Sequence, residues 1–180
     1  MGVQFRNQAT VGGSIFGRYG FSDVLTALLS LDTFVELYNG GTIRLSEFVK
    51  RKPDKDLLLS VIVRKSKRMF RYDSVRRTKT DFPVIACAVV TGIVNGKETW
   101  YFSVGARPMK AALLEKQWEI PLDASEEQIT EYAGKAASEF TYGTNMRGSA
   151  EYRQHLAEVL LKREIRSILE EKSGTQKVSD

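Results

Sequence analysis

The chain has 180 residues, of which 42% are hydrophobic and 27% are charged, and its formal net charge is +5 at pH 7. This composition predicts a packed core and argues against general disorder, and no apolar run reaches the roughly 18 residues of a membrane-spanning helix. The first residues lack the apolar core of a secretion signal, so we expect a soluble protein of the cytoplasm.

The N-terminal stretch combines adjacent glycines with hydroxyl side chains. Residues 9–11 are expected to be extended, and Gly12 and Gly13 follow, where the lack of a Cβ permits positive φ and a close approach to the backbone. The N–H groups of such a turn can converge on an anion. Ser22 is an expected N-cap before an apolar run, and Asp23 is beside it. This arrangement suits a nucleotide, although an ordinary tight turn is the commoner meaning of two adjacent glycines.

Apolar periodicity and turn residues predict the rest of the first half. The expected elements are a helix over 23–31, a strand over 33–38, a hairpin turn at Asn39-Gly40, a return strand over 42–45, a short helix or turn over 46–49, a charged loop over 50–55 and a strand over 56–63.

The second half is predicted in the same way, with its clearest hairpin at Asn95-Gly96 and a capping box at residues 125–128. The expected elements are a basic turn over 64–68 and strands over 69–73, 82–94 and 98–104. Helices are expected over 110–116 and from 126 to about 140, and a long helix is expected to follow residues 146–153 and to end near residue 171. A polar tail follows from about residue 173.

The single cysteine and the single histidine limit the metal chemistry of the chain. Cys87 lies in an apolar run and is expected to be a buried, inert thiol, while His155 lies in a helical pattern. One residue of each kind cannot assemble a zinc or iron–sulfur site by the usual spacings, so any such metal is expected in a partner. The basic run 64–68 leaves nucleic-acid binding as a disfavoured alternative, because no aromatic platform adjoins it in the sequence.

Residues 6–15 read Arg-Asn-Gln-Ala-Thr-Val-Gly-Gly-Ser-Ile, and Ser22-Asp23 follow them. This string resembles the second flavin-binding segment of the molybdenum hydroxylase flavoproteins, which are the FAD-carrying medium subunits of xanthine dehydrogenase, aerobic carbon monoxide dehydrogenase and their relatives. The usual family form is Arg-Asn-x-Ala-Thr-Ile-Gly-Gly-Asn. Val11 is a conservative replacement, whereas Ser14 replaces an amide with a shorter hydroxyl.

Further strings resemble the same family in the same order. Leu57 and Leu58 fall in register with an Ile-Leu pair that packs against the flavin, although leucines in strands are most often core residues. Residues 74–83 resemble Lys-x-x-Arg-Arg-x-x-x-Asp-x-Ala, with Asp73 at the position of the flavin-contacting lysine. A carboxylate cannot donate a hydrogen bond as an ammonium does, so this contact has no counterpart here. Residues 147–153 resemble Arg-Ala-Ser-Ala-Glu-Tyr-Arg.

The resemblance implies an α+β fold. Residues 1–65 would form the second half of a two-subdomain FAD-binding fold, and residues 66–180 a C-terminal domain with an antiparallel sheet packed with helices. The family's first subdomain has no counterpart in this chain, which is therefore expected to be a fragment or one piece of a split subunit.

The resemblance also implies a set of cofactor-binding residues. Backbone N–H groups would bind the pyrophosphate, with a hydroxyl in support. A serine and an aspartate would contact a nucleotide hydroxyl or position the loop, and two leucines would pack on the flavin. The N–H groups belong to Val11, Gly12, Gly13 and Ser14, and the supporting hydroxyl to Thr10. The serine and aspartate are Ser22 and Asp23, and the leucines are Leu57 and Leu58. No residue of the chain is expected to be catalytic or to bind metal.

The implied function is that of the FAD-binding subunit of a molybdenum hydroxylase. A large partner would hold the molybdenum cofactor, and electrons would pass through [2Fe–2S] clusters of a small partner to FAD, then to NAD or another acceptor. Two alternatives within the same complex are a flavin-free docking module and half of a split flavin subunit.

Overall fold

The computed structural model describes residues 3–94, 96–116 and 118–176. The helices are α1 (Val3–Gln8), α2 (Val11–Phe16), α3 (Asp23–Ser30), α4 (Leu45–Lys50), α5 (Glu126–Ser138) and α6 (Ala150–Gln176). The strands are β1 (Thr33–Leu37), β2 (Gly41–Arg44), β3 (Leu58–Val63), β4 (Arg68–Val75), β5 (Ile85–Val94), β6 (Lys97–Gly105) and β7 (Ala112–Leu113).

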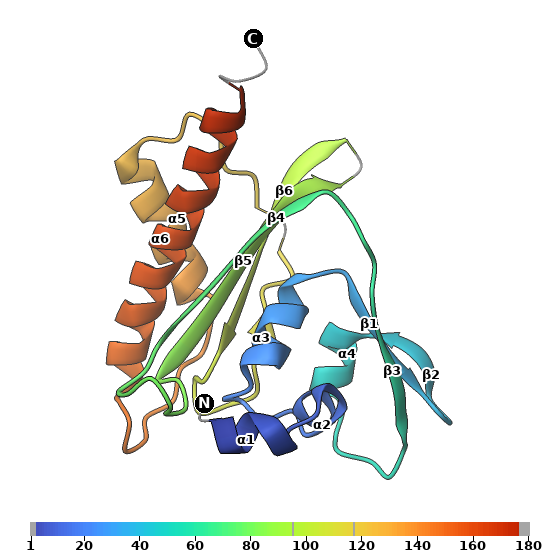
Figure 1. The fold of residues 1–180 in the computed structure, drawn as a ribbon. Coiled ribbons are helices and arrows are strands. Elements are labelled where there is room, and N and C mark those ends of the chain that lie inside the picture. Colours follow the sequence, from blue (N-terminus) through green and yellow to red (C-terminus); the bar gives the residue numbers. More distant parts are fainter. Residues whose placement is uncertain (1–2, 95, 117, 177–180) are drawn as a thin grey trace.

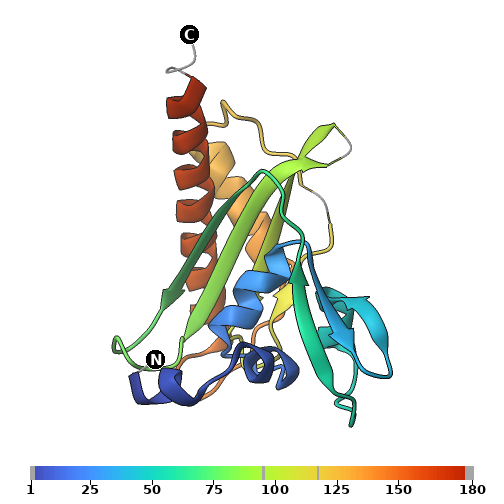
Figure 2. The same ribbon diagram turned by 45° about the vertical axis from the view of Figure 1, so that its right-hand side comes forward.

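The strands form two antiparallel sheets. A small sheet has the order β2-β1-β3, and a larger one has the order β4-β5-β6-β7. Helices α5 and α6 cover one face of the larger sheet, and α3 lies against its other face, next to the small sheet (Figures 1 and 2). The loop between β3 and β4 leads from one sheet to the other and contains residues 64–67 of the basic run, whose last residue, Arg68, begins β4.

Each sheet contributes to a separate hydrophobic core. The larger core lies between the four-stranded sheet and the helices α5 and α6, where Trp100, Phe102 and Leu161 are fully buried. The smaller core lies between the three-stranded sheet and the helices α2, α3 and α4, around Phe48 and Leu25. The burial of these apolar side chains is the main source of stability for each half.

Helix α3 joins the two halves because it packs on the larger sheet as well as in the smaller core. The Ser103 hydroxyl of β6 donates a hydrogen bond to the Thr26 carbonyl at 2.7 Å. A Cβ at Gly105 would overlap the Thr26 hydroxyl, so only glycine permits this close approach. These contacts fix the position of α3, which Ser22 caps, against the larger sheet.

The predicted α+β class is confirmed, with an antiparallel sheet packed with helices in the second half. The hairpin at residues 39–40, the cap at Ser22 and the capping box of Ser125 and Gln128 also agree with their predictions. Gly96 has positive φ in the second predicted hairpin, while Asn95 lies outside the described residues.

Three local predictions were wrong. Residues 11–16 form a helix instead of continuing an extended segment into a glycine turn, because Thr10 caps them. Residues 112–113 form a strand within the predicted helix 110–116, since pairing with β6 outweighs the helix propensity of an Ala-Ala-Leu-Leu run. The predicted tail is helical as far as Gln176, where α6 ends, and residues 177–180 lie outside the described chain.

Candidate functional site

The start of α2 is an exposed helix N-terminus without bulky side chains on two successive residues. The Gly13 N–H donates to the Thr10 hydroxyl at 3.0 Å, and the Ser14 hydroxyl donates to the Thr10 carbonyl at 2.9 Å. The N–H groups of Val11 and Gly12 belong to the first turn, where no carbonyl of a preceding turn is available to them. Neither glycine has the positive φ expected of a nest, so the anion-binding potential is that of a capped helix start.

Two adjoining grooves lie along this helix start. One groove, of about 330 Å³, is lined by Thr10, Gly13, Ser14 and Ser22 and by the aromatic rings of Phe5, Tyr19 and Phe21. The second, of about 590 Å³, shares Ser14 and Ser22 and adds Asp23, Arg6 and Lys79. Hydroxyls and two cations therefore face the same space, which suits an anionic ligand.

The grooves bring together only part of the predicted cofactor-binding set. Val11 and Gly12 do not line either groove; Val11 is 57% exposed. Gly12 lies beside the β3 side of the smaller core, because a Cβ there would be 3.9 Å from the Leu58 Cδ2.

The two predicted leucines lie in different environments. Leu58 begins β3 and packs against the smaller core, next to Gly12. Leu57 precedes the strand and is 62% exposed, although it directly adjoins Leu58 in the chain. A core role therefore describes Leu58, whereas Leu57 presents an apolar side chain to the surface.

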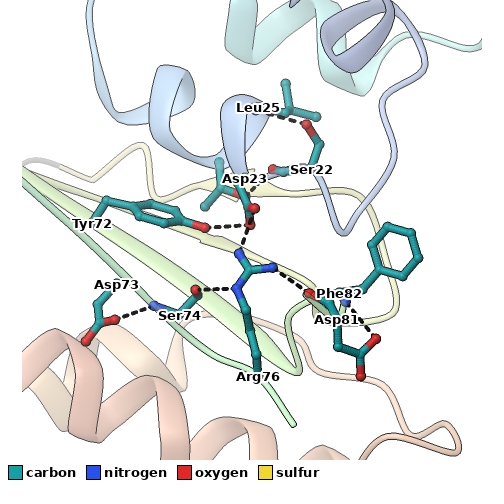
Figure 3. Close-up of polar contacts among 10 residues, drawn as sticks. Ser22, Asp23, Leu25, Tyr72, Asp73, Ser74, Arg76, Asp81 and Phe82 are labelled. Atoms are coloured by element: carbon teal, nitrogen blue, oxygen red, sulfur yellow. Dashed lines mark hydrogen bonds and ion pairs between the residues drawn. The ribbon is translucent and has the colours of Figure 1, made fainter. Parts of the chain in front are cut away.

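Ser22 and Asp23 begin α3 and connect it to the larger sheet (Figure 3). The Leu25 N–H donates to the Ser22 hydroxyl at 3.2 Å, which caps the helix. The Asp23 carboxylate accepts one hydrogen bond from the Tyr72 hydroxyl and another from the Arg76 guanidinium, both at 2.6 Å. Asp23 is thus a cross-link between α3 and β4 in addition to its place in the groove.

Arg76 extends this cross-link towards the start of β5. Its guanidinium donates to the Asp81 carbonyl at 2.8 Å and to the Ser74 hydroxyl at 3.2 Å, besides its ion pair with Asp23. The Arg76 and Asp23 side chains are both largely buried, so solvent screens their attraction less than that of an open surface pair. Loop 76–81 and the first turn of α3 are held as one unit.

Tyr72 is the functional candidate that the sequence reasoning missed. Asp73 pairs across the sheet with Cys87, on the face packed by α6, and it points away from Asp23 (Figure 3). Tyr72 is on the opposite face, and burial, with the adjacent Asp23 carboxylate, raises the pKa of its phenol. The alternation of strand side chains was the available signal, because adjacent residues face opposite sides.

We expect Tyr72→Phe to lower the free energy of unfolding by about 1.5–3 kcal/mol, the cost of a hydrogen bond to a charged group. The change removes only the hydroxyl that donates to Asp23. Urea unfolding would measure the loss, with Tyr38→Phe as the matched control, since Tyr38 is 72% exposed. Equal stability of the two variants would show that the Tyr72 hydroxyl does not contribute to the cross-link.

The described residues give little support for metal binding, for thiol chemistry or for a membrane-spanning helix. They contain no group of three or more histidine, cysteine, aspartate or glutamate side chains arranged to hold a metal ion. Cys87 is buried, and burial raises the pKa of its thiol, so it is in the unreactive protonated form. In the same part of the chain, no helix combines the length and the apolar character needed to cross a membrane.

The chain matches two known protein families in succession. Residues 2–65 match the FAD binding domain in molybdopterin dehydrogenase. Residues 70–168 match the CO dehydrogenase flavoprotein C-terminal domain. The curated relative YgfM of Escherichia coli K12, an uncharacterised protein, is 26% identical over 156 residues, which are 87% of this chain and 57% of YgfM.

Solved structures share the fold. Quinoline 2-oxidoreductase from Pseudomonas putida 86 gives a TM-score of 0.77 at 17% identity, covering 94% of this chain and 63% of the matched chain. The cyanide-inactivated Cu,Mo-CO dehydrogenase gives a TM-score of 0.75 at 22% identity, covering 92% and 62%. The chain therefore spans less than two thirds of these relatives.

Proposed function

Because this chain belongs to the family of FAD-binding flavoproteins of the molybdopterin and CO dehydrogenases, we propose that it binds FAD at the start of α2. The observation that carries this proposal is the glycine-containing helix start within the matched FAD-binding segment. The N–H groups of Val11 and Gly12 at this helix start have no intrahelical acceptor, and Val11 is exposed. These donors fit the pyrophosphate of a dinucleotide.

The proposed pyrophosphate contacts follow from which donors are available. The N–H groups of Val11 and Gly12 would bind phosphate oxygens, and the Ser14 hydroxyl would join them by turning from the Thr10 carbonyl, to which it donates in this structure. Thr10 supports this arrangement through its cap on Gly13, whose N–H it already accepts. Arg6 and Lys79 supply positive charge from the larger groove, which Ser14 also lines.

The remaining proposed contacts belong to the nucleotide hydroxyls and the flavin. Ser22 and Asp23 line the grooves beside the helix start, and each carboxylate oxygen of Asp23 keeps a second lone pair for a ligand hydroxyl. Leu57 is exposed just before β3 and would meet the flavin ring, while Leu58, packed on the smaller core beside Gly12, would support it.

Bound FAD would supply the redox chemistry, and this chain would bind and orient it. In the proposed complex, a large partner carries the molybdenum cofactor, a small partner carries [2Fe–2S] clusters, and NAD or another compound accepts the electrons. The proposed domains are residues 1–65 for FAD binding and 66–180 for the C-terminal part, and the proposed location is the cytoplasm.

We expect Gly12→Val to weaken FAD binding by about tenfold or more, which corresponds to at least about 1.4 kcal/mol. The added methyls would occupy the space through which a phosphate approaches the first N–H groups of α2, while the contact with Leu58 remains an ordinary one. Flavin fluorescence titration of the purified chain measures the affinity.

The matched control is Gly174→Val, because this helical glycine of α6 also has open space around its Cβ position. Circular dichroism would establish that both variants keep the fold. Unchanged FAD affinity in a folded Gly12→Val variant would contradict the assignment of the pyrophosphate site.

A flavin-free docking module is the second candidate function. The observation that favours it is Ser14, whose shorter hydroxyl replaces the amide of the family's asparagine. Titration of FAD with and without the N-terminal half of a related flavoprotein separates the two functions. Binding only after that addition indicates half of a divided site, and no binding in either case indicates docking.

A further inference from the structure

A separate cavity, of about 470 Å³, adjoins the two grooves but is lined mostly by other residues. We call it the arginine pocket. It lies among the loop from α2 to α3, the start of β5, the loop after β6 and the loop before α6. Tyr19 and Phe21, whose rings stack at 5.3 Å, line both the arginine pocket and the smaller groove.

The arginine pocket is lined by cations without any acidic residue among its described lining. The cationic residues that line it are Arg18, Lys110, Arg147 and Arg153. The Lys110 ammonium donates to the carbonyls of Val49 and Arg51, so no carboxylate neutralises it. The cavity therefore carries an excess of positive charge.

Arg153 contributes a buried charge that only neutral groups solvate. It is 1% exposed, and it donates to the carbonyls of Val84 and Ala106 and to the amide oxygen of Asn145. Its Nε has no hydrogen-bond partner among the described residues. Burial lowers the pKa of Arg153, and the positive charge of Arg147 lowers it further. An uncompensated buried charge is costly, and an anion at the pocket would offset this cost.

Arg18 is a second buried arginine in the lining of the pocket whose guanidinium has nitrogen atoms without a hydrogen-bond partner among the described residues. It is 4% exposed, its Nε and Nη2 have no partner in the described part of the chain, and its guanidinium lies 3.9 Å from the Phe48 ring centroid. Burial lowers the pKa of this side chain as well. Two buried arginines thus border one cavity without a directly bonded carboxylate.

The remaining walls of the pocket are apolar and aromatic. Phe82 packs against Phe21 with ring centroids 4.4 Å apart, and the Arg147 guanidinium lies 5.6 Å from the Phe82 ring centroid. Arg147 also forms an ion pair with Asp81 at 3.5 Å, which a ligand anion can compete with because both side chains are partly exposed. A flat apolar group would fit beside the rings and an anionic group beside the arginines.

We propose that the arginine pocket binds a small aromatic anion, with its carboxylate or phosphate beside Arg147 and Arg153 and its ring beside Phe21 and Phe82. This site is separate from the proposed FAD site, and its ligand is a second small molecule. Inorganic phosphate alone would use the charge of the pocket without its aromatic wall.

Isothermal titration calorimetry on the purified chain tests the proposal with benzoate, phenyl phosphate, inorganic phosphate and benzyl alcohol. We expect the two aromatic anions to bind more tightly than inorganic phosphate and more tightly than uncharged benzyl alcohol. Arg147→Gln should weaken phenyl phosphate about tenfold, because it removes a charge-assisted contact. Asp81→Asn should strengthen the binding several-fold, since it frees Arg147 and keeps an oxygen for the Phe82 N–H.

Arg163→Gln is the matched control, because it removes the same charge from an exposed position on α6. Equal effects of Arg147→Gln and Arg163→Gln would overturn the proposal, and so would equal affinity for benzoate and benzyl alcohol. Displacement of phenyl phosphate by FAD would also overturn it, because the pocket would then belong to the flavin site. Loss of FAD binding in Gly12→Val, with phenyl phosphate binding intact, would show that the two ligands use separate sites. The proposal for the arginine pocket could then stand or fail independently of the FAD proposal.

Discussion

Arg153→Ala is expected to lower the free energy of unfolding by about 3–5 kcal/mol, at the upper end of single-substitution effects. The guanidinium joins the carbonyls of Val84 and Ala106 with the side chain of Asn145. Its removal leaves the buried carbonyls of Val84 and Ala106 without this donor and opens a cavity of the size of a long side chain. Urea or thermal unfolding, followed by circular dichroism, measures the loss.

Two comparison variants make the Arg153 prediction specific. Arg163→Ala removes an exposed arginine from the same helix and should change stability by less than about 0.5 kcal/mol. Arg153→Lys keeps the charge but replaces the planar guanidinium with a single ammonium, which offers fewer donors. We therefore expect an intermediate loss in the free energy of unfolding. A loss below about 1 kcal/mol for Arg153→Ala would show that the loops hold together without this side chain.

Glu164→Met is expected to raise the free energy of unfolding by roughly 1–3 kcal/mol at pH 8, the typical cost of burying a polar group without a partner. Glu164 is 4% exposed on α6, and its carboxylate has no side-chain hydrogen-bond partner among the described residues, although the backbone of Asp73 offsets part of the cost of its burial. A methionine of similar length would fill the same space with apolar atoms.

The gain from Glu164→Met should depend on pH in a definite direction. Burial, followed by the negative charge of Asp73, raises the pKa of the Glu164 carboxyl in the folded chain. The folded state therefore holds this proton more tightly than the unfolded state. Stability from this group is greatest below the unfolded pKa of about 4.3, and it falls as the pH rises towards the folded pKa.

Urea unfolding at pH 4.5 and pH 8 tests this direction. The difference between Glu164→Met and the parent chain should be larger at pH 8, because the destabilising effect of the raised pKa grows as the pH rises above the unfolded pKa. Glu170→Met is the control, because Glu170 is exposed on the same helix. A difference that is equal at both pH values would contradict a buried carboxyl with a raised pKa.

The parts of the fold that could be predicted from the sequence are those that neighbouring residues determine. Ser125 and Gln128 form a capping box from side chains three positions apart, and Ser22 caps α3 in the same local manner. The turn between β1 and β2 has positive φ at Gly41, a conformation that glycine adopts without a Cβ clash. None of these features needs a contact from a distant part of the chain.

The features that the sequence did not predict depend on distant partners. Residues 112–113 join β6 as a strand, which only the position of β6 decides. Ser14 and Ser22 line one groove, whereas Leu57 is at the surface and Leu58 packs on the smaller core. Nothing near Asp23 in the sequence indicates that its carboxylate binds Arg76.

The position of α3 between the two sheets has a consequence for the order of folding during synthesis. The hydrogen bond from Ser103 to Thr26 closes a loop between residues 77 positions apart, and the smaller core includes Ala111. A nascent chain that ends before these residues leaves the apolar side of α3 uncovered. The N-terminal segment therefore completes its packing only after β6 and Ala111 have left the ribosome, and until then it is the part most exposed to aggregation.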